Sequence, residues 1–325
     1  MSRKGNPKNT KRIKDPSQSV FVMISRNSHP NKKALILSGG GARGAYHAGV
    51  WKYLTEQNWV PDIICGSSSG ALNAIAIGCG LTSKELIHLW ESIQQDNIFN
   101  ISILKQITNF FCHRGFYPLS DSKSLKKIFT DSLSLEKLKE SKFEIVISAV
   151  HVLNSRLRFF QNQEIQLEHI MASCAIPIMF PWSYVDGEPY WDGGVMANTP
   201  LLPAIQSGAN EIIVVLQSPV GGAKMPEPTG KFRALERLFE QMLIGSYESS
   251  LSHLEWDYKN SEPGERHSHT FNAGNGKEKI KILTVSPENM LGFPSILRFT
   301  KKQAAYLISE GYNTAQAQLS SLFTR

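Results

Sequence analysis

The sequence predicts an α/β layered fold, and two observations support this class. Short apolar runs alternate along the chain with segments of helical periodicity, which is the pattern of strands connected by helices. The run at 211–216 is apolar throughout its interior, which is typical of a parallel strand buried on both faces. With 325 residues, of which 41% are hydrophobic, the chain can form one large core or two small ones.

The expected elements follow in chain order. A buried strand at 34–37 leads through a glycine loop into a helix that ends near 57, and an apolar run at 61–65 leads into a second helix. Segments 83–130 are expected to be mainly helical, with candidate core residues Trp90, Ile93, Phe110 and Phe111. The remaining strands are expected at 143–150, 157–160, 211–216 and 280–285, and a closing helix from 301 onward.

Two C-terminal segments allow more than one interpretation. From 231 to about 258, five apolar side chains recur at helical spacing, which favours a helix facing the core over a membrane-docking helix; they are Phe232, Leu235, Leu238, Phe239 and Met242. Residues 261–279 are polar and Gly-rich, and we expect a solvated loop there. His267 and His269 lie on it two apart, which is weak evidence for a metal site, and we expect no metal and no cofactor.

The net charge of +7 belongs to the N-terminus. Residues 1–33 carry nine Lys or Arg and one acid, a charge of +8, and the rest of the chain has a charge of −1. We expect 1–33 to be a disordered basic arm that either solubilises the protein or attracts it to anionic lipid. No aromatic and basic platform supports nucleic-acid binding.

Cysteine spacing and the N-terminus indicate an intracellular protein. Cys65, Cys79, Cys112 and Cys174 lie far apart and are expected to be free buried thiols. The N-terminal apolar segment at 20–24 is too short for a secretory signal, although export without such a signal would leave the same sequence. We expect a cytoplasmic or peripheral membrane protein, and the sequence does not indicate its oligomeric state.

The most informative motif is Gly66-Ser67-Ser68-Ser69-Gly70, between a short strand and a helix. Gly-x-Ser-x-Gly in that context predicts a nucleophile elbow, a turn so sharp that small flanking residues are needed. The serine hydroxyl is then exposed above the edge of the sheet. The motif therefore indicates a hydrolase with Ser68 as nucleophile.

A glycine loop, residues 39–44, directly follows the first strand. Its amides and the helix N-terminus behind them could bind a phosphate or an oxyanion. A dinucleotide site requires an acidic residue at the end of the second strand, where this chain has Cys65-Gly66-Ser67-Ser68. Beside an activated serine, the same loop makes an oxyanion hole.

The base for this serine is expected in the stretch 190–200, where Asp192 is followed by Gly193 and Gly194 and flanked by aromatic residues. Partial desolvation would raise the pKa of such a carboxylate and make it a better proton acceptor. Taken alone, the same stretch also suits an ordinary Asp-Gly turn.

Together, the glycine loop, the elbow, the Asp192-Gly193-Gly194 loop and the small-residue segment 172–177 resemble the patatin-like phospholipase family over about 34–216. The resemblance implies a three-layer α/β/α fold with a mostly parallel central sheet. It implies a catalytic domain at 34–216 and an extension at 217–325 that completes the same fold.

The resemblance also assigns roles to residues. It implies a Ser68–Asp192 dyad that cleaves fatty-acyl esters of lipids, at a membrane or micelle surface, through an acyl-enzyme. The oxyanion hole is assigned to Gly39, Gly40, Gly41, Gly44 and Ser69, with the amides of Gly40 and Gly41 as principal donors. Arg43 is placed where it either meets a lipid phosphate or forms a structural salt bridge.

Two other functions remain open from the residues. An α/β-hydrolase triad would need a histidine after Asp192, and only His253, His267 and His269 are available. A phosphate- or nucleotide-binding module would use the glycine loop but leave the elbow and Asp192 unexplained.

Overall fold

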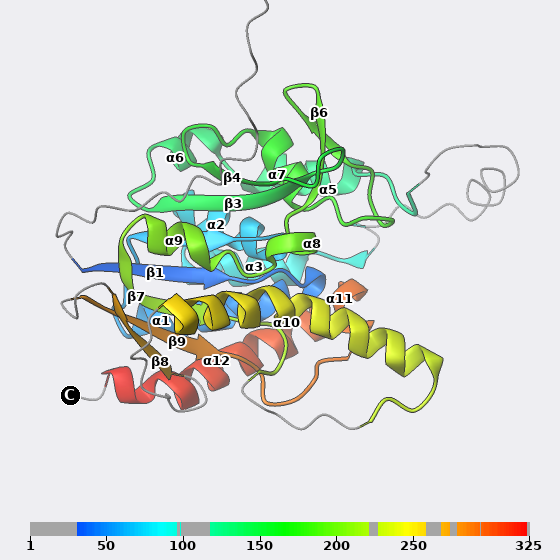
Figure 1. The fold of residues 1–325 in the computed structure, drawn as a ribbon. Coiled ribbons are helices and arrows are strands. Elements are labelled where there is room, and N and C mark those ends of the chain that lie inside the picture. Colours follow the sequence, from blue (N-terminus) through cyan, green and yellow to red (C-terminus); the bar gives the residue numbers. More distant parts are fainter. Residues whose placement is uncertain are drawn as a thin grey trace, which may run out of the picture.

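One mixed sheet of nine strands organises the part of the chain that the structure describes (Figure 1). The structure is a computed structural model, and it describes residues 31–95, 98, 118–220, 227–257, 268–273, 278–292 and 294–323. Most of the basic arm lies outside these residues, as do Phe110, Phe111, Cys112 and His267.

The strands run in the order β5-β6-β3-β2-β1-β7-β9-β8, and β4 also pairs with β3. The five strands from β3 to β9 in this order are mutually parallel, and the outer strands pair antiparallel. Their bounds are β1 Lys32–Leu37, β2 Ile63–Gly66, β3 Glu144–His151, β4 Leu157–Gln161, β5 Ser183–Val185, β6 Glu188–Asp192, β7 Ala209–Val215, β8 Ser268–Ala273 and β9 Glu278–Val285.

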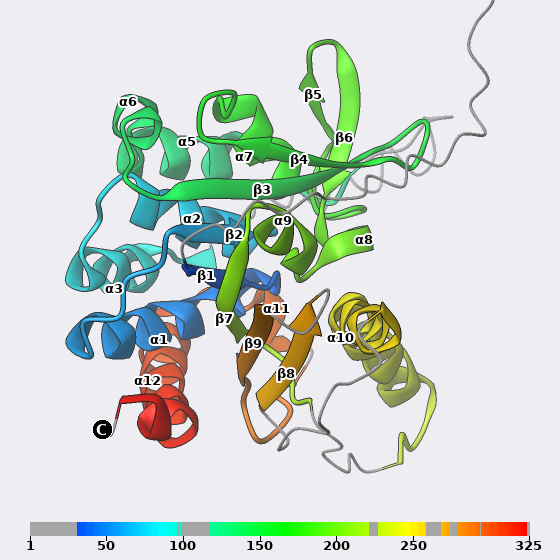
Figure 2. The same ribbon diagram turned by 60° about the vertical axis from the view of Figure 1, so that its left-hand side comes forward.

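Helices cover both faces of the sheet, as Figure 2 shows. On one face lie α1 (Ala45–Glu56), α2 (Ser69–Gly78), α3 (Ser83–Ser92) and α12 (Lys301–Phe323), and on the other lie α8 (Gly194–Ala197), α9 (Leu201–Gln206) and α10 (Lys231–Asp257). The remaining short elements are η1 (Gly41–Gly44), α5 (Lys123–Ser132), α6 (Leu135–Lys139), α7 (Leu167–Ser173) and α11 (Pro294–Leu297). This is the α/β layered fold that the sequence pattern predicts, in the three-layer α/β/α form with a mostly parallel centre that the family resemblance implies.

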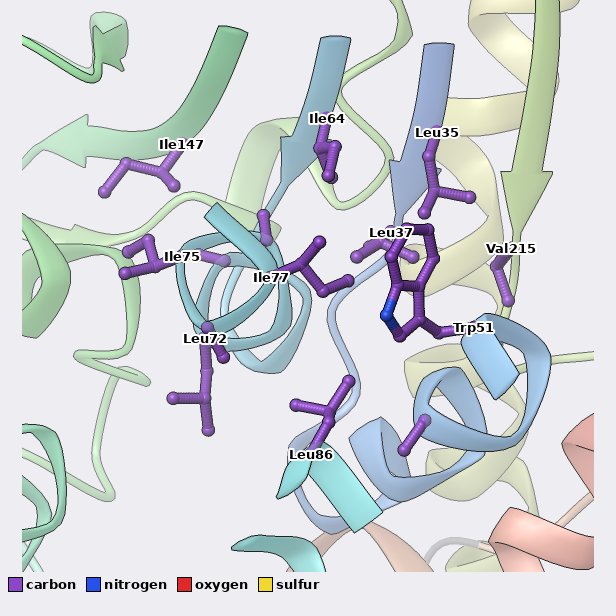
Figure 3. Packing of buried hydrophobic residues seen from close by; sticks show 14 of the residues in the cluster. Leu35, Leu37, Trp51, Ile64, Leu72, Ile75, Ile77, Leu86, Ile147 and Val215 are labelled. Atoms are coloured by element: carbon purple, nitrogen blue, oxygen red, sulfur yellow. The ribbon is translucent and has the colours of Figure 1, made fainter. Parts of the chain in front are cut away.

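The alternation of side chains along the strands creates two cores. On β1, Leu35 and Leu37 face the layer of α1, α2 and α3 (Figure 3), whereas Ala34 and Ile36 face the layer of α9 and α10. All four are almost fully buried. Because the central strands bury both faces, they read as continuous apolar runs in the sequence.

The last helix, α12, packs directly on α1. A Cβ at Gly49 of α1 would overlap the carbonyl oxygen of Ile308, and a Cβ at Gly311 of α12 would overlap the carbonyl oxygen of Tyr46. Glycine at both positions lets the two backbones approach more closely than side chains would allow. Helix α1 begins directly after the glycine loop, so this contact supports the loop from behind.

Two expectations for the C-terminal third are wrong in part. Residues 268–273 form the edge strand β8, because antiparallel pairing with the apolar strand β9 supplies the backbone hydrogen bonds that a polar segment could not indicate by itself. In α10, the side chains that face the core are chiefly Tyr247 and Leu251, whereas Leu235, Leu238 and Met242 are exposed.

Cys65, Cys79 and Cys174 are free and buried. Within the described ranges, no three or more His, Cys, Asp or Glu side chains are grouped so that they could hold a metal ion. None of the helices in these ranges is both long enough and apolar enough to cross a bilayer.

Candidate active site

Ser68 lies in the turn between β2 and α2, at the carboxyl end of the parallel strands. Its backbone has φ 54° and ψ −124°, a conformation that is strained for any residue with a Cβ. A Cβ at Gly66 would overlap the backbone of Gly70, and a Cβ at Gly70 would overlap the carbonyl oxygen of Leu37. The two glycines of the motif are therefore needed for the turn to form.

Asp192 is the last residue of β6, and its side chain reaches Ser68. The carboxylate accepts a hydrogen bond from the backbone N–H of Gly194 at 2.7 Å, and the Ser68 hydroxyl lies close enough to lower its pKa. Its own N–H donates to the carbonyl oxygen of Ala175 at 3.0 Å, and Gly193 packs so closely on Ser148 of β3 that a Cβ would overlap it. The carboxylate is thus held at a fixed position beside the serine.

Burial raises the pKa of Asp192 from 3.8 to about 7, even though its interactions with Ser68 and Gly194 lower the pKa. Asp192 is 4% exposed, so water stabilises its charged form poorly. No cationic side chain among the described residues lowers its pKa. A carboxylate with a pKa near neutrality is suited to accept and return a proton at physiological pH.

Some backbone amides near Ser68 already donate a hydrogen bond within the protein, and others remain available to an oxyanion. The N–H of Gly39 donates to the carbonyl oxygen of Asn198 at 3.0 Å. The expectation that Gly39 contributes to the oxyanion hole is therefore wrong. Among the described residues, the N–H groups of Gly40, Gly41 and Ser69 have no protein acceptor. Gly41 and Ser69 line the same cavity as Ser68, so these amides are the candidate oxyanion donors.

Gly44 ends η1 at a packing contact. A Cβ there would lie within 2.5 to 2.7 Å of the Trp90 ring and the Ser69 side chain. The need for glycine at this position is therefore steric.

Arg43 does not reach a substrate phosphate, because its guanidinium is completely buried. It forms an ion pair with Glu240 of α10 at 2.5 Å. Of the two roles expected for Arg43, this contact is the structural salt bridge. The remaining hydrogen bonds of this guanidinium go to the carbonyl oxygens of Gln217 and Gly292 and to the hydroxyls of Ser218 and Ser295. These contacts fix the end of the glycine loop.

A polar residue in the Asp192 stretch, Asn198, joins the glycine loop to the segment that follows Asp192. Besides accepting from Gly39 with its carbonyl oxygen, it donates from Nδ2 to the carbonyl oxygens of Gly39 at 3.3 Å and Leu243 at 3.0 Å. Asn198 falls within the motif at 190–200, but the sequence pattern indicates no role for it. Its position six residues after Asp192 was the available signal.

A second buried group supports the glycine loop from below. His47 lies between the side-chain amides of Asn73 and Gln217, at 3.1 and 3.0 Å. Burial lowers the pKa of His47 to about 3, so the ring is neutral and links Asn73 to Gln217 through hydrogen bonds. Gln217 also donates to the carbonyl oxygen of Ser38 at 3.1 Å. No local motif marks these residues.

The histidines considered for a triad are elsewhere. His253 is on α10, exposed, with its Nδ1 2.7 Å from the carbonyl oxygen of Ser249. His267 and the side chain of His269 lie outside the described residues.

An apolar cavity of about 50 Å³ opens beside the serine. Its walls come from the elbow and from α3, α5 and the loops that follow α7 and α11, including Leu72, Trp90, Ile93, Phe129, Phe180 and Phe299. This lining suits a hydrocarbon chain better than a phosphate.

Comparisons with known proteins identify a family model and several relatives that resemble this chain. A family model described as patatin-like phospholipase matches residues 35–205. The cGAMP-activated phospholipase of Pseudomonas aeruginosa is 27% identical over 256 residues, which cover 69% of this chain and 74% of that protein. Triacylglycerol lipase ptl3 of Schizosaccharomyces pombe is 27% identical over 160 residues, 45% of this chain and one third (33%) of the lipase. The crystal structure of VipD from Legionella pneumophila superposes with a TM-score of 0.48 and 17% identity, covering 90% of this chain and 68% of VipD.

Proposed function

The chain belongs to the patatin-like phospholipase family, and on that premise we propose that it hydrolyses fatty-acyl esters of lipids through an acyl-enzyme on Ser68, with Asp192 as the base. The observation that carries this proposal is the position of the Ser68 hydroxyl beside the buried carboxylate of Asp192, whose pKa is raised to about 7. A phospholipid is the proposed substrate class, since the Pseudomonas relative is named as a phospholipase.

In the proposed first half-reaction, Asp192 accepts the proton of Ser68 as the hydroxyl oxygen attacks the ester carbonyl carbon. The carbonyl oxygen becomes an oxyanion, and the amides of Gly40, Gly41 and Ser69 donate to it. One such donor is worth about 3 kcal/mol of barrier in other acyl-transfer enzymes. When the intermediate collapses, the alcohol leaves with the proton that Asp192 returns to it, and the acyl group stays on Ser68.

In the second half-reaction, Asp192 removes a proton from water, and the hydroxide attacks the acyl carbonyl carbon. Collapse of this intermediate returns the proton to the Ser68 oxygen and releases the fatty acid. The acyl chain is proposed to enter the apolar cavity between α3 and α5, whose volume of about 50 Å³ would have to increase for a long chain. This cavity also favours an ester substrate over the phosphate ligand of a binding module.

The test is hydrolysis of a panel of phospholipids, lysophospholipids and glycerides, followed by mass spectrometry of the released fatty acid. Because the Pseudomonas relative is named as cGAMP-activated, the assay is run with and without that nucleotide. Ser68→Ala and Asp192→Asn are each expected to lower kcat by at least about a thousandfold. A fluorophosphonate probe is expected to label the wild type and not Ser68→Ala.

Two matched controls separate the alternatives. Ser67→Ala removes the neighbouring hydroxyl, which is buried and has no hydrogen-bond partner within the described part of the chain, and is expected to keep activity and labelling. His253→Ala is expected to keep activity as well. Loss of activity in His253→Ala together with full activity in Asp192→Asn would replace the dyad by a triad.

A further inference from the structure

Helix α10 has apolar side chains on two faces, and among the described residues only one of these faces packs on the rest of the protein. On the packed face, Tyr247 and Leu251 are buried against the sheet, and Glu240 is buried in its ion pair with Arg43 of η1. Leu235, Leu238 and Met242 are 62%, 54% and 55% exposed. At 100° per residue these three side chains fall within about 60° of one another and nearly opposite the buried face. We call them the outer stripe.

The outer stripe lies at the active-site end of the molecule. Figures 1 and 2 show the N-terminal half of α10 extending past the sheet on the side where β1 ends and α8 and α11 lie. The helix is joined there to the loop that follows Asp192, since Asn198 donates to the carbonyl oxygen of Leu243 and the N–H of Thr199 donates to Ser246 Oγ at 3.2 Å.

A groove continues the outer stripe toward Asp192. It has a volume of about 700 Å³, runs between α10 and the pair α8–α9, and has Met242 in one wall. The opposite wall presents Val195, Met196 and Leu202, which are 43%, 49% and 53% exposed. Val195 and Met196 follow Asp192 by three and four residues. The exposed apolar surface thus extends from α10 to the loop that holds the proposed base.

The charge at the N-terminal end of the stripe suits an anionic lipid surface. Lys231 is exposed one helical turn before Leu235 on the same side of α10, whereas Arg233 is exposed nearly opposite the stripe. Helices that bind in the plane of a bilayer combine such apolar faces with basic side chains that reach the headgroups. Large exposed apolar patches at a site are also typical of interaction surfaces.

We propose that the outer stripe, together with Val195 and Met196, docks the enzyme on the surface of an anionic lipid bilayer. This inference rests on the proposed lipid substrate, because a docked bilayer would be the source of the ester that reaches Ser68. Docking on this side brings the loop of Asp192 next to the membrane while the buried face of α10 keeps its contacts with Arg43 and Asn198.

Binding is measured by co-sedimentation with vesicles of phosphatidylcholine and phosphatidylglycerol in a three-to-one mixture, using the Ser68→Ala protein so that no lipid is consumed. Each of Leu235→Gln, Leu238→Gln and Met242→Gln is expected to weaken binding about fivefold, and the triple variant at least about a hundredfold. Val60→Gln is the matched control, because Val60 is 50% exposed and precedes β2 at the opposite end of the parallel strands. It is expected to bind like the parent.

Activity is measured in the same variants with an intact Ser68. Hydrolysis of a soluble short-chain ester is expected to stay at the wild-type level, while hydrolysis of vesicle lipid falls with binding. Unchanged sedimentation of the triple variant would overturn the docking surface. So would a wild-type protein that is dimeric by light scattering and becomes monomeric in the triple variant, since the stripe would then join two copies. Wild-type binding without hydrolysis of any ester would contradict the proposed function and leave docking intact.

Discussion

The raised pKa of Asp192 predicts that this carboxylate makes the protein less stable as the pH rises. In the native state its pKa is about 7, and in the unfolded chain it returns to about 3.8. Below pH 4 both states are protonated and the carboxyl group has no effect. Between pH 4 and 7 the unfolded chain loses the proton first, so stability falls by about 1.4 kcal/mol per pH unit, or roughly 4 kcal/mol in all. Above pH 7 the loss is constant.

The perturbation is Asp192→Asn, which removes the titration and keeps the shape of the side chain. The variant's free energy of unfolding, relative to that of the wild type, is expected to rise by about 3 kcal/mol between pH 4.5 and 8. For a chain of this length that corresponds to about 4 to 5 °C in melting temperature. Urea denaturation at a series of pH values measures it. Asp186→Asn is the control, since Asp186 is exposed in the turn between β5 and β6. A difference between wild type and Asp192→Asn that does not change with pH would refute the reasoning.

Two further predictions concern the elbow and the buried ion pair. Ser68→Gly is expected to be more stable than Ser68→Ala by about 1 kcal/mol, because both lack the hydroxyl and only alanine keeps a Cβ at φ 54°. The melting temperatures of the two variants measure this difference. Equal melting temperatures would mean that the turn is unstrained. Arg43→Met is expected to cost about 3 to 5 kcal/mol because Glu240 is left buried without its partner, and Arg43→Met/Glu240→Met is expected to recover most of it. A double variant as unstable in urea as Arg43→Met would assign the loss to the other contacts of Arg43.

The parts of the site that are local in sequence could be predicted, and the parts that join distant segments could not. The Gly66–Gly70 turn is determined by its own glycines and by the strand and helix on either side. The partners of Arg43 stand 174 to 252 residues away. Likewise, the N–H of Gly39 is used by Asn198, a contact that exists only once β6 has paired with β3.

The same distinction explains the two errors in the C-terminal third. The periodicity of α10 correctly indicates a helix, but a period of 3.6 does not say which of two apolar faces is buried. Tyr247 and Leu251 fill the space over β7 and β9, and the stripe at Leu235 is left outside. Strand β8 has a polar sequence because it needs only one partner at the edge of the sheet.

The close contact of α1 with α12 has a consequence for the timing of synthesis. Helix α1, which carries the glycine loop at its start, finds its tightest neighbour only when Gly311 has been translated. At typical rates of elongation, Gly311 follows Asp192 by on the order of ten seconds. During that interval the nascent chain contains both proposed catalytic residues but lacks the helix that supports the glycine loop. We therefore expect the complete site to form only after Gly311 has been translated.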